Sequence, residues 1–242
     1  MQDFLYDSFY KLEKDHWWFR ARLEIVDSLL PPFNNETKII DFGCGTGVML
    51  EHLAQQCDIT GMDFSPLALE YCRKRFAGKL LAMDLSNTME LEEKYDIGLS
   101  LDVIEHLEDD VAALINMKRA LNENGRLIVT VPAFNFLWSA HDINNEHIRR
   151  YTIKTLRAAA KAAGFDIEYI SYYSFWLMPL VSIMRLAGKF LGVNKNSGME
   201  TKMHGRFVNN LLYRIFRSEH RFTSRRIRMP IGASIIAVFK TY

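Results

Sequence analysis

Apolar and polar residues alternate along this chain with two different periods. Short runs rich in β-branched residues alternate with longer stretches in which apolar side chains recur at helical spacing, and these patterns are typical of strands and amphipathic helices. The strand-like runs are 38–42, 58–62, 79–83, 95–101, 126–131, 165–172 and 231–239. The helix-like stretches are 48–56, 66–76, 109–121 with Gly125 as a stop, and 153–163 with Thr152 as N-cap and Gly164 as a stop. This alternation predicts an α/β fold with a doubly wound, mostly parallel sheet and helices on both faces.

Two long connections depart from this alternation. Residues 132–151 are rich in aromatic and charged side chains, and residues 173–230 form an insertion before the last strand. Long connections in compact domains are usually lids or binding loops. We therefore expect substrate recognition in these two segments.

The bulk composition is that of an ordinary globular protein. Hydrophobic residues make up 49% and charged residues 24% of the 242 residues, and a net charge of +1 gives no overall field for nucleic acid or an anionic membrane. The three cysteines, at 44, 57 and 72, show no paired spacing, which indicates a reducing compartment. No apolar signal segment is visible, and the longest uncharged run, 169–184, is shorter than the ~20 residues of a spanning helix. These features predict a cytoplasmic protein.

The first expected strand runs into the sequence IIDFGCGTG, with glycines at 43, 45 and 47. Glycine lets the backbone pass close to a ligand and adopt the positive φ angles of a tight turn, and the following helix favours an anionic group at its N-terminus. A dinucleotide fingerprint would place its third glycine at position 48, where this chain has Val. Asp41 suits an ammonium group and would repel a pyrophosphate. Asp41, Gly43, Gly45 and Gly47 therefore favour an amino-acid head group.

Acids also end the next two expected strands. Asp63, followed by Phe64, comes 20 residues after Gly43 and is placed to accept both hydroxyls of a ribose. Asp84 is placed to accept an adenine amino hydrogen beside an apolar wall that includes Leu85. Open α/β sheets bind ligands at the carboxyl ends of their strands. Three acids in register with the glycine loop therefore favour a nucleoside ligand over simple turn-forming or capping roles.

Together the segments IIDFGCGTG, GMDFSP, AMDL and SLDVIEHLED resemble the class I S-adenosylmethionine-dependent methyltransferases. The resemblance covers about residues 36–170 and the closing strand at 231–239. It implies one Rossmann-like domain over residues 1–242, with a seven-stranded sheet whose last strand is antiparallel and inserted beside the sixth. It also implies S-adenosylmethionine as cofactor, with Gly43, Gly45 and Gly47 around the methionine moiety, Asp63 on the ribose, Asp84 on the adenine edge and Leu101 near the sulfonium.

Within this class the chain is similar to ubiquinone-biosynthesis-type O-methyltransferases, which share a Trp-Trp pair, here at 17 and 18, in an N-terminal helical cover (1–35). The resemblance implies that a following arginine, for which we favour Arg22 over Arg20, meets the cofactor carboxylate; the alternative is an exposed arginine on the cover. In some members an acid–x–x–Glu–His arrangement holds a divalent metal, and Asp102, Glu105 and His106 match it. Many methyltransferases carry Glu-His in this loop without a metal, so we expect none here.

Methyl transfer to a hydroxyl group needs alignment and removal of a proton. His106, after the fourth expected strand, and His141, after the fifth, are the candidate bases, because histidine titrates near neutral pH. The expected substrate-binding residues are Trp138, His147, Arg149, Arg150 and Tyr151. His147 is a further candidate base, and the two arginines suit a carboxylate or phosphate. The alternative is a loop pinned by His–Asp and Arg–Glu pairs.

The insertion at 173–230 has its own charge pattern. Residues 175–193 are apolar except for Arg185 and Lys189, and residues 202–228 carry eight basic residues against one acid, Glu219. The apolar side chains that share one helical face are Phe207, Leu211, Leu212, Ile215 and Phe216. Three interpretations compete: a lid packed on the sheet, an element docked on a bilayer or lipid-like substrate, and an RNA-binding stripe. The last is disfavoured because the aromatic residues lie on the apolar face.

We therefore predict an S-adenosylmethionine-dependent methyltransferase that methylates oxygen on a small apolar or lipid-linked acceptor with a histidine base, in the cytoplasm or at the inner face of a membrane. The sequence SLDV stands where an Asn-Pro-Pro-Tyr motif would indicate adenine N-methylation. N- or C-methylation of a polar small molecule or RNA, and a non-catalytic cofactor-binding protein, stay open as alternatives. The glycine spacing disfavours a dehydrogenase.

Overall fold

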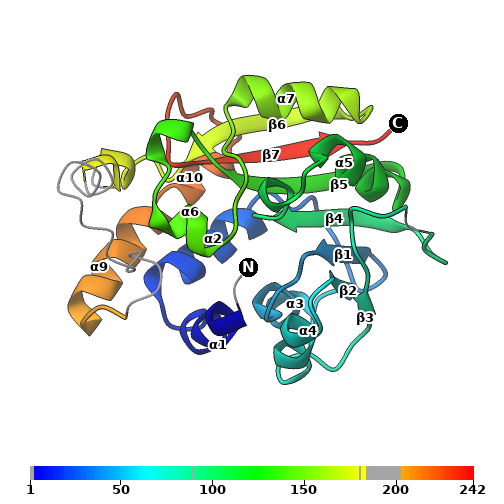
Figure 1. The fold of residues 1–242 in the computed structure, drawn as a ribbon, viewed down its shortest axis with the longest axis horizontal. Helices are drawn as coiled ribbons and strands as arrows, with labels where there is room; N and C mark the ends of the chain where they lie inside the picture. The colour runs from blue at the N-terminus through cyan, green and yellow to red at the C-terminus, as the bar shows by residue number, and fades with distance from the viewer. Residues whose placement is uncertain (1–2, 89, 180, 184–202) are drawn as a thin grey trace.

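Seven strands form one mixed sheet in a computed structural model of the chain, which describes residues 3–88, 90–179, 181–183 and 203–242. The order across the sheet is β3-β2-β1-β4-β5-β7-β6, and β7 alone runs antiparallel to its neighbours (Figure 1). The strands are β1 (Lys38–Phe42), β2 (Asp58–Asp63), β3 (Leu80–Ala82), β4 (Tyr95–Leu101), β5 (Leu121–Pro132), β6 (Asp166–Tyr173) and β7 (Ser234–Lys240). The predicted fold class is confirmed, including the antiparallel strand beside the sixth.

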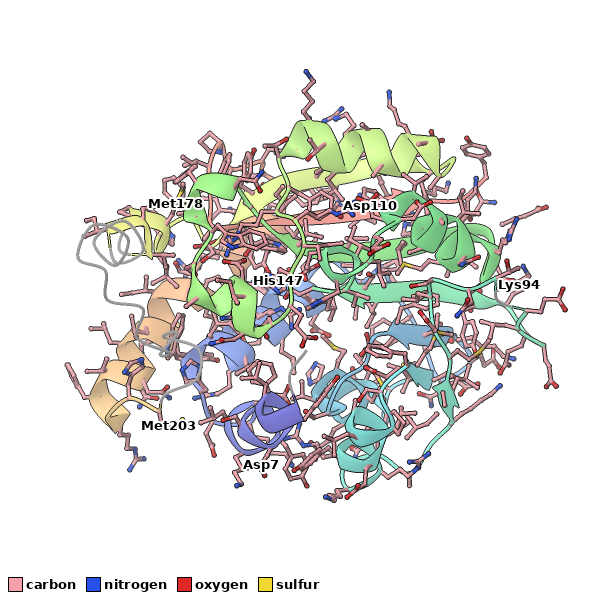
Figure 2. All side chains as sticks on the ribbon, in the orientation of Figure 1. Asp7, Lys94, Asp110, His147, Met178 and Met203 are labelled. Carbon is pink, nitrogen blue, oxygen red and sulfur yellow. The ribbon has the colours of Figure 1, made fainter. Side chains whose placement is uncertain are left out.

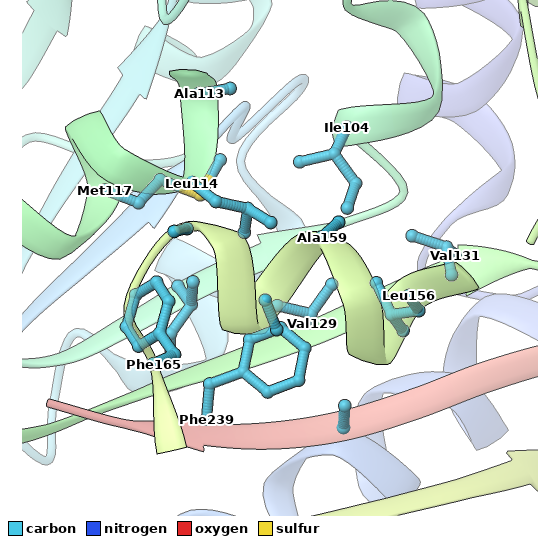
Figure 3. Close-up of a cluster of buried hydrophobic side chains, with 14 of the residues drawn as sticks. Ile104, Ala113, Leu114, Met117, Val129, Val131, Leu156, Ala159, Phe165 and Phe239 are labelled. Carbon is cyan, nitrogen blue, oxygen red and sulfur yellow. The ribbon is translucent and has the colours of Figure 1, made fainter. Parts of the chain in front are cut away.

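Helices cover both faces of the sheet, and each face has its own hydrophobic core. The described helices are α1 (Asp3–Leu12), α2 (Trp17–Asp27), α3 (Val48–Leu53), α4 (Pro66–Arg73), α5 (Asp110–Arg119), α6 (Ala140–Asn144), α7 (Ile153–Ala162), α9 (Arg206–Arg217) and α10 (His220–Thr223), with 3₁₀ turns η1 (Ile104–His106) and η2 (Asn135–Leu137). Leu114 of α5 and Leu156 of α7 pack with Val129 and Phe239 of the sheet on one face (Figure 3). Residues of α2, α3, α4 and α9 form the core on the other face.

Side-chain caps fix where several helices begin. The hydroxyl of Ser65 accepts a hydrogen bond from Ala68 N (3.3 Å), and Pro66 opens α4 at a position where no backbone donor is needed. Thr152 caps α7 as predicted, and its hydroxyl accepts from Thr155 N (3.2 Å). These local signals are legible in the sequence because the cap and its partner lie within one turn.

The end of α5 is an exception, because Gly125 does not stop it. The helix ends at Arg119, and β5 begins at Leu121. The pairing of β5 with β4 shifts register between Tyr95 and Ile97, so the strand absorbs extra residues before its regular part. Gly125 therefore belongs to a bulged strand start and not to a helix end.

The carboxyl ends of the parallel strands lie at one edge of the sheet, and α1, α2, α6 and α9 gather at this end (Figure 1). Helix α9 packs on α2: Asn209 Oδ1 accepts from Trp17 N (3.0 Å), and the rings of Trp17 and Phe216 lie 6.0 Å apart. Glu219 then fastens the insertion to the end of β6 by accepting from Ser174 N (2.6 Å) and Trp176 N (3.1 Å). The insertion is thus joined to both the cover and the sheet.

This packing divides the apolar face predicted for residues 202–228. Phe216 is fully buried and Leu212 half-buried, whereas Phe207 is 82% exposed and Leu211 and Ile215 are also exposed. The buried side of α9 is set by the residues that meet α2, which the spacing alone does not reveal. Residues 184–202, including the end of the apolar stretch 175–193, lie outside the described residues. Among the described helices, none has the length and apolar character needed to cross a membrane.

Candidate active site

A cavity of about 510 Å³ opens at the carboxyl ends of the parallel strands. Its glycine-loop wall includes Arg22, Asp41, Gly43, Gly45, Asp63, Phe64, Asp84, Leu85, Leu101 and Asp102. Its histidine wall includes Glu105, His106, His141, Asn145, His147 and Arg150. Its apolar wall includes Tyr6, Phe9, Trp17, Trp18, Phe19, Leu177 and Val181. One cavity therefore combines nucleoside-type acids, titratable imidazoles and an aromatic lining.

The three glycines of the loop serve different purposes. Gly43 and Gly47 have φ angles of 74° and 85°, and a Cβ on them would lie 2.6 Å from Val103 and 2.6 Å from Cys72, respectively. Gly45, with φ of 54°, would present its Cβ to open space, with nothing within 4 Å. Gly43 and Gly45 line the cavity, whereas Gly47 lies outside its lining and opens α3. Only Gly45 leaves room that a ligand could fill.

Asp41 is a buried acid with an unsatisfied oxygen. Its side chain is almost fully covered, and its Oδ1 has no hydrogen-bond partner among the described residues. Burial raises the pKa of Asp41 to about 7, against the nearby charge of Arg22, which lowers it. A buried carboxylate without a partner is costly, so this position fits the ammonium group of a bound amino-acid moiety. The residues therefore fit the cofactor that the resemblance implies.

The other predicted cofactor residues also line this wall. Asp63 accepts from Gly45 N and Ser65 N, both at 2.9 Å, so it supports the turn as well as facing the cavity. Asp84 is exposed and accepts from Ser86 N (2.8 Å). Phe64, 66% exposed, and the buried Leu85 offer apolar surface beside these acids. The strand ends thus present two carboxylates and two apolar side chains to one ligand site.

Arg22 is covered rather than exposed, and it lines the cavity. Its Nη2 donates to Asp102 Oδ2 (2.5 Å) and Thr130 Oγ1 (3.2 Å). The ion pair holds the guanidinium at the end of β4, where a ligand carboxylate could compete with Asp102 for it. Asp102 itself adopts a positive φ of 59° at this turn.

The divalent-metal alternative names Asp102, Glu105 and His106. In the structure the carboxylate of Asp102 pairs with Arg22, and the ligand atoms that lie within 4.8 Å of one another belong to Glu105, His106 and His147 instead. We therefore derive no chemistry from a metal at these three residues.

Glu105, His106 and His147 form a titratable cluster in which ring nitrogens and carboxylate oxygens lie within 4.8 Å of one another. Neither carboxylate oxygen of the fully buried Glu105 has a hydrogen-bond partner within the described part of the chain. Burial raises the pKa of Glu105 well above its usual value. Burial, followed by the neighbouring His147, lowers the pKa of His106 to about 4. Burial thus disfavours the charged forms of both Glu105 and His106.

Asp142 anchors the histidine wall, and the sequence pattern alone does not single it out. It is fully buried, and it accepts from Arg150 Nε (2.7 Å) and Nη2 (3.0 Å) and from Ser139 N (2.8 Å). The ring Nδ1 of His147 lies 3.0 Å from its Oδ1. Although burial acts to raise it, hydrogen bonds from His147 and Arg150 hold the pKa of Asp142 below its usual value. The capping box of Ser139 with Asp142 was the available local signal.

The predicted substrate-binding residues separate into two groups. His147 and Arg150 line the cavity, but Arg150 is buried and committed to Asp142 and to Ala133 O (2.9 Å). Trp138, Arg149 and Tyr151 lie outside the lining formed by the described residues. Tyr151 is in the core and donates to Asp110 Oδ2 (2.7 Å), and Arg149 pairs with the same carboxylate at 3.2 Å. These contacts pin the loop, as in the alternative given in the sequence analysis, but the arginines pair with aspartates and not with glutamates.

The apolar wall was predicted only in part. Leu177 and Val181 come from the segment after β6, within the insertion 173–230 for which substrate recognition is expected. Tyr6 and Phe9 of α1 and Phe19 of α2 were missed. The aromatic spacing of the N-terminal segment was their local signal, and it does not distinguish a core face from a cavity face.

Comparisons with known proteins agree with this geometry. Residues 15–170 match the methyltransferase domain family. The chain is 30% identical over 101 residues to the mitochondrial ubiquinone biosynthesis O-methyltransferase of Schizosaccharomyces pombe, covering 38% of this chain and 37% of that protein. It is 26% identical over 160 residues to a probable S-adenosylmethionine-dependent methyltransferase of Mycobacterium tuberculosis, covering 64% and 57%. The chain thus spans less than two thirds of these curated relatives.

Solved structures share the fold. The N-methyltransferase NodS of Bradyrhizobium japonicum in complex with S-adenosyl-L-homocysteine has a TM-score of 0.57 at 16% identity, covering 94% of this chain and 89% of that one. An S-adenosylmethionine-dependent methyltransferase of Mesorhizobium loti has a TM-score of 0.60 at 13% identity, covering 94% and 99%. The chain belongs to the methyltransferase domain family, and within it is a class I S-adenosylmethionine-dependent methyltransferase similar to the ubiquinone biosynthesis O-methyltransferases.

Proposed function

We propose that this protein methylates an oxygen atom of a small apolar or lipid-linked acceptor, with a histidine as base. The observation that carries the proposal is that the apolar wall and the histidine wall belong to one cavity with the glycine loop. An aromatic and aliphatic lining suits a hydrophobic acceptor body, and imidazoles suit the proton of a hydroxyl group. The relatives named as ubiquinone biosynthesis O-methyltransferases support the same choice.

The residues divide the work of such a reaction. When bound, S-adenosylmethionine supplies a methyl group that is already activated by its sulfonium. Asp41 would pair with the ammonium and Asp63 would hold the ribose, so the glycine-loop wall fixes the donor end of the cavity. Alignment of the acceptor by the other two walls supplies much of the rate, and a base adds about 10²–10⁴-fold.

The exposed face of α9 supports a lipid-linked acceptor. Phe207, Leu211 and Ile215 are exposed on this helix, and Arg206 and Arg214 are exposed beside them. An amphipathic helix with apolar and basic surface is typical of elements that lie on anionic membranes. Because α9 packs on α2, which contributes to the cavity lining, such a contact would bring a membrane-held acceptor close to the site.

The test is transfer of an isotopically labelled methyl group from S-adenosylmethionine to a cell extract, separated into organic, aqueous, protein and RNA fractions. We expect label in the organic fraction. Ether-cleaving treatment should release this label as methanol or another volatile product. Excess S-adenosylhomocysteine should suppress the transfer. Label confined to the aqueous, protein or RNA fraction would reject the apolar acceptor. Cofactor binding without label in any fraction would favour a non-catalytic protein.

A further inference from the structure

We infer that His147 is the catalytic base of this site and that Asp142, held by Arg150, is the residue that positions it. The inference rests on the proposed transfer to a hydroxyl group and names the group that removes the proton. It chooses His147, which the sequence analysis gives as a substrate-binding residue and a further candidate base, over His106 and His141. His147 lies near the centre of the view in Figure 2, on the loop that leads from α6 to α7.

The contact with Asp142 determines which ring nitrogen of His147 is available. Asp142 receives two hydrogen bonds from Arg150, so its carboxylate is ionised and can only accept hydrogen bonds. Nδ1 of His147, 3.0 Å away, must therefore carry the hydrogen and donate it. The lone pair is left on Nε2, on the side of Glu105, whose Oε1 is 3.9 Å away and lines the same cavity. The arrangement gives one tautomer and one orientation, as a general base requires.

Charged and titratable groups from three parts of the chain lie next to His147. Asp142 from α6 and Arg150 from the same loop form a bidentate pair beside its ring, and Glu105 and His106 from η1 and His141 from α6 also lie near it. A carboxylate at hydrogen-bond distance stabilises an imidazolium that forms during the reaction. Burial disfavours the charged form of Glu105.

His106 is disfavoured as the base. Burial and the proximity of His147 lower the pKa of His106 to about 4, which makes it a weak base at neutral pH. The ring nitrogens of His141 lie 3.2 and 3.4 Å from the side-chain amide of Asn145, whereas Nδ1 of His147 lies 3.0 Å from a carboxylate that Arg150 holds in place.

The proposed step balances as a simple displacement. The acceptor hydroxyl gives its proton to Nε2 of His147 while its oxygen forms a bond to the methyl carbon. The electron pair of the breaking carbon–sulfur bond stays on sulfur, which leaves as a neutral thioether. The imidazolium of His147 then releases its proton to water, so no oxidant, reductant or further co-reactant is needed.

The first experiment compares three histidine variants in the labelled-methyl assay on the organic fraction. His147→Asn should lower the rate by about 10²–10⁴-fold, while S-adenosylhomocysteine affinity, measured by calorimetry, and thermal unfolding stay close to wild type. His106→Asn should lower it by less than about tenfold. His52→Asn is the matched control, because His52 also pairs with an aspartate, Asp27 at 3.4 Å, but lies outside the cavity lining. Equal rates for wild type and His147→Asn would overturn the inference.

The positioning role of Asp142 is tested by the pH profile. Removing its charge takes a stabilising carboxylate away from the imidazolium, so Asp142→Asn should move the acid limb of the rate profile to lower pH as well as reduce the maximum. A purely structural role would reduce the maximum and leave the limb in place, and that result would remove Asp142 from the inference.

A third measurement needs no acceptor and no turnover. Nitrogen-15 NMR of histidine-labelled protein should show one ring, absent in His147→Asn, with hydrogen on Nδ1 and an unprotonated Nε2 at pH 8, and Asp142→Asn should abolish this tautomer preference. Hydrogen on Nε2 would overturn the inference, as would stoichiometric zinc or iron in the protein together with loss of methyl transfer on chelation. If the wild-type protein labels only polar products, the proposed O-methylation of an apolar acceptor is wrong. The NMR measurement of the His147 tautomer still decides whether Asp142 orients His147.

Discussion

Asp41 and Asp142 are two buried aspartates at the same cavity, and the protein treats them in opposite ways. Asp142 is surrounded by donors from Arg150, Ser139 and His147, which hold its pKa below the usual value. Asp41 keeps an oxygen without a partner among the described residues, and burial raises its pKa to about 7. A satisfied carboxylate stabilises and orients its neighbours, whereas an unsatisfied one stores unfavourable energy that a cationic ligand can relieve.

The two aspartates belong to walls of the cavity that are built in different ways. The glycine-loop wall is built mainly from a continuous part of the chain, in which each strand end delivers its side chains to the same edge. The histidine and apolar walls combine α1, α2, η1, α6 and the segment after β6. The first wall is therefore a consequence of local sequence and sheet topology, and the others depend on tertiary packing.

The largest predicted effect concerns the geometry of the glycine-loop wall. Gly43→Ala combines a left-handed φ, costing about 1–2 kcal/mol, with a Cβ 2.6 Å from Val103, costing a further ~1–3 kcal/mol. We expect a clear loss of stability in urea unfolding. Gly45→Ala is the matched control: it has the φ cost alone, about 1–2 kcal/mol, because nothing lies within 4 Å of its Cβ. Equal destabilisation by the two variants would show that the packing against Val103 does not matter.

A second prediction separates the two aspartates by ligand binding. Asp41→Asn should weaken S-adenosylhomocysteine binding by about 10–100-fold at pH 8, the value of one charge-assisted contact. In wild type the affinity should fall as pH drops below about 7, because the free protein then holds Asp41 protonated and the ammonium needs its ionised form. Calorimetry across pH 5.5–8.5 measures both effects. A pH-independent affinity in wild type would contradict the role of Asp41.

Stability should respond in the opposite direction. The folded-state pKa of Asp41 is raised, so its ionisation destabilises the free protein progressively as pH rises from the unfolded value near 4 to about 7. Asp41→Asn should therefore leave the free protein at least as stable as wild type at pH 8 in thermal unfolding. If Asp41 had only a structural role, Asp41→Asn would lower the thermal stability of the free protein instead.

The contrast between the walls also shows what could be predicted from the sequence. Asp41, Asp63 and Asp84 were placed at one edge because each follows a short apolar strand, and parallel topology brings strand ends together. Asp142 was not recognised, because its importance comes from Arg150 and His147, which meet it only through the folded loop. The short-range sequence pattern thus predicts where a side chain lies in the fold, but it does not predict which residues distant in the sequence contact that side chain.

The same limit explains errors elsewhere in the chain. Tyr151 looks like a site residue beside two arginines, yet the 2.7 Å contact with Asp110, 41 residues earlier, keeps it in the core. The helical periodicity of α9 groups Phe207 with Phe216, but packing on α2 buries only the latter. Helical spacing predicts which residues share one face of a helix, while packing against the neighbouring helix determines which of these residues are buried.

The third prediction concerns the attachment of the insertion. Glu219 is buried and accepts two backbone hydrogen bonds at the end of β6. Glu219→Ala leaves those two amides without an acceptor and should cost about 1–3 kcal/mol in urea unfolding. Glu219→Gln keeps an acceptor oxygen and should cost less. If both variants were as stable as wild type, the other contacts of the insertion would be sufficient to hold it, namely those with α2 and those of Arg226, Ile227 and Met229 with β6.

The smallest effect on stability, and the sharpest test of the membrane contact, comes from the exposed face of α9. Phe207 is 82% exposed, so Phe207→Ser should change the free energy of unfolding by less than about 0.5 kcal/mol. It should nevertheless weaken co-sedimentation with phosphatidylglycerol vesicles, because apolar burial and charge attraction act together in such contacts. Arg214→Gln should weaken the same binding mainly at low salt, where charge attraction is least screened. If both variants bound the vesicles as strongly as the wild type, the membrane contact would lie elsewhere on the protein. If the wild type did not bind at any salt concentration, the exposed apolar face of α9 would have a different partner.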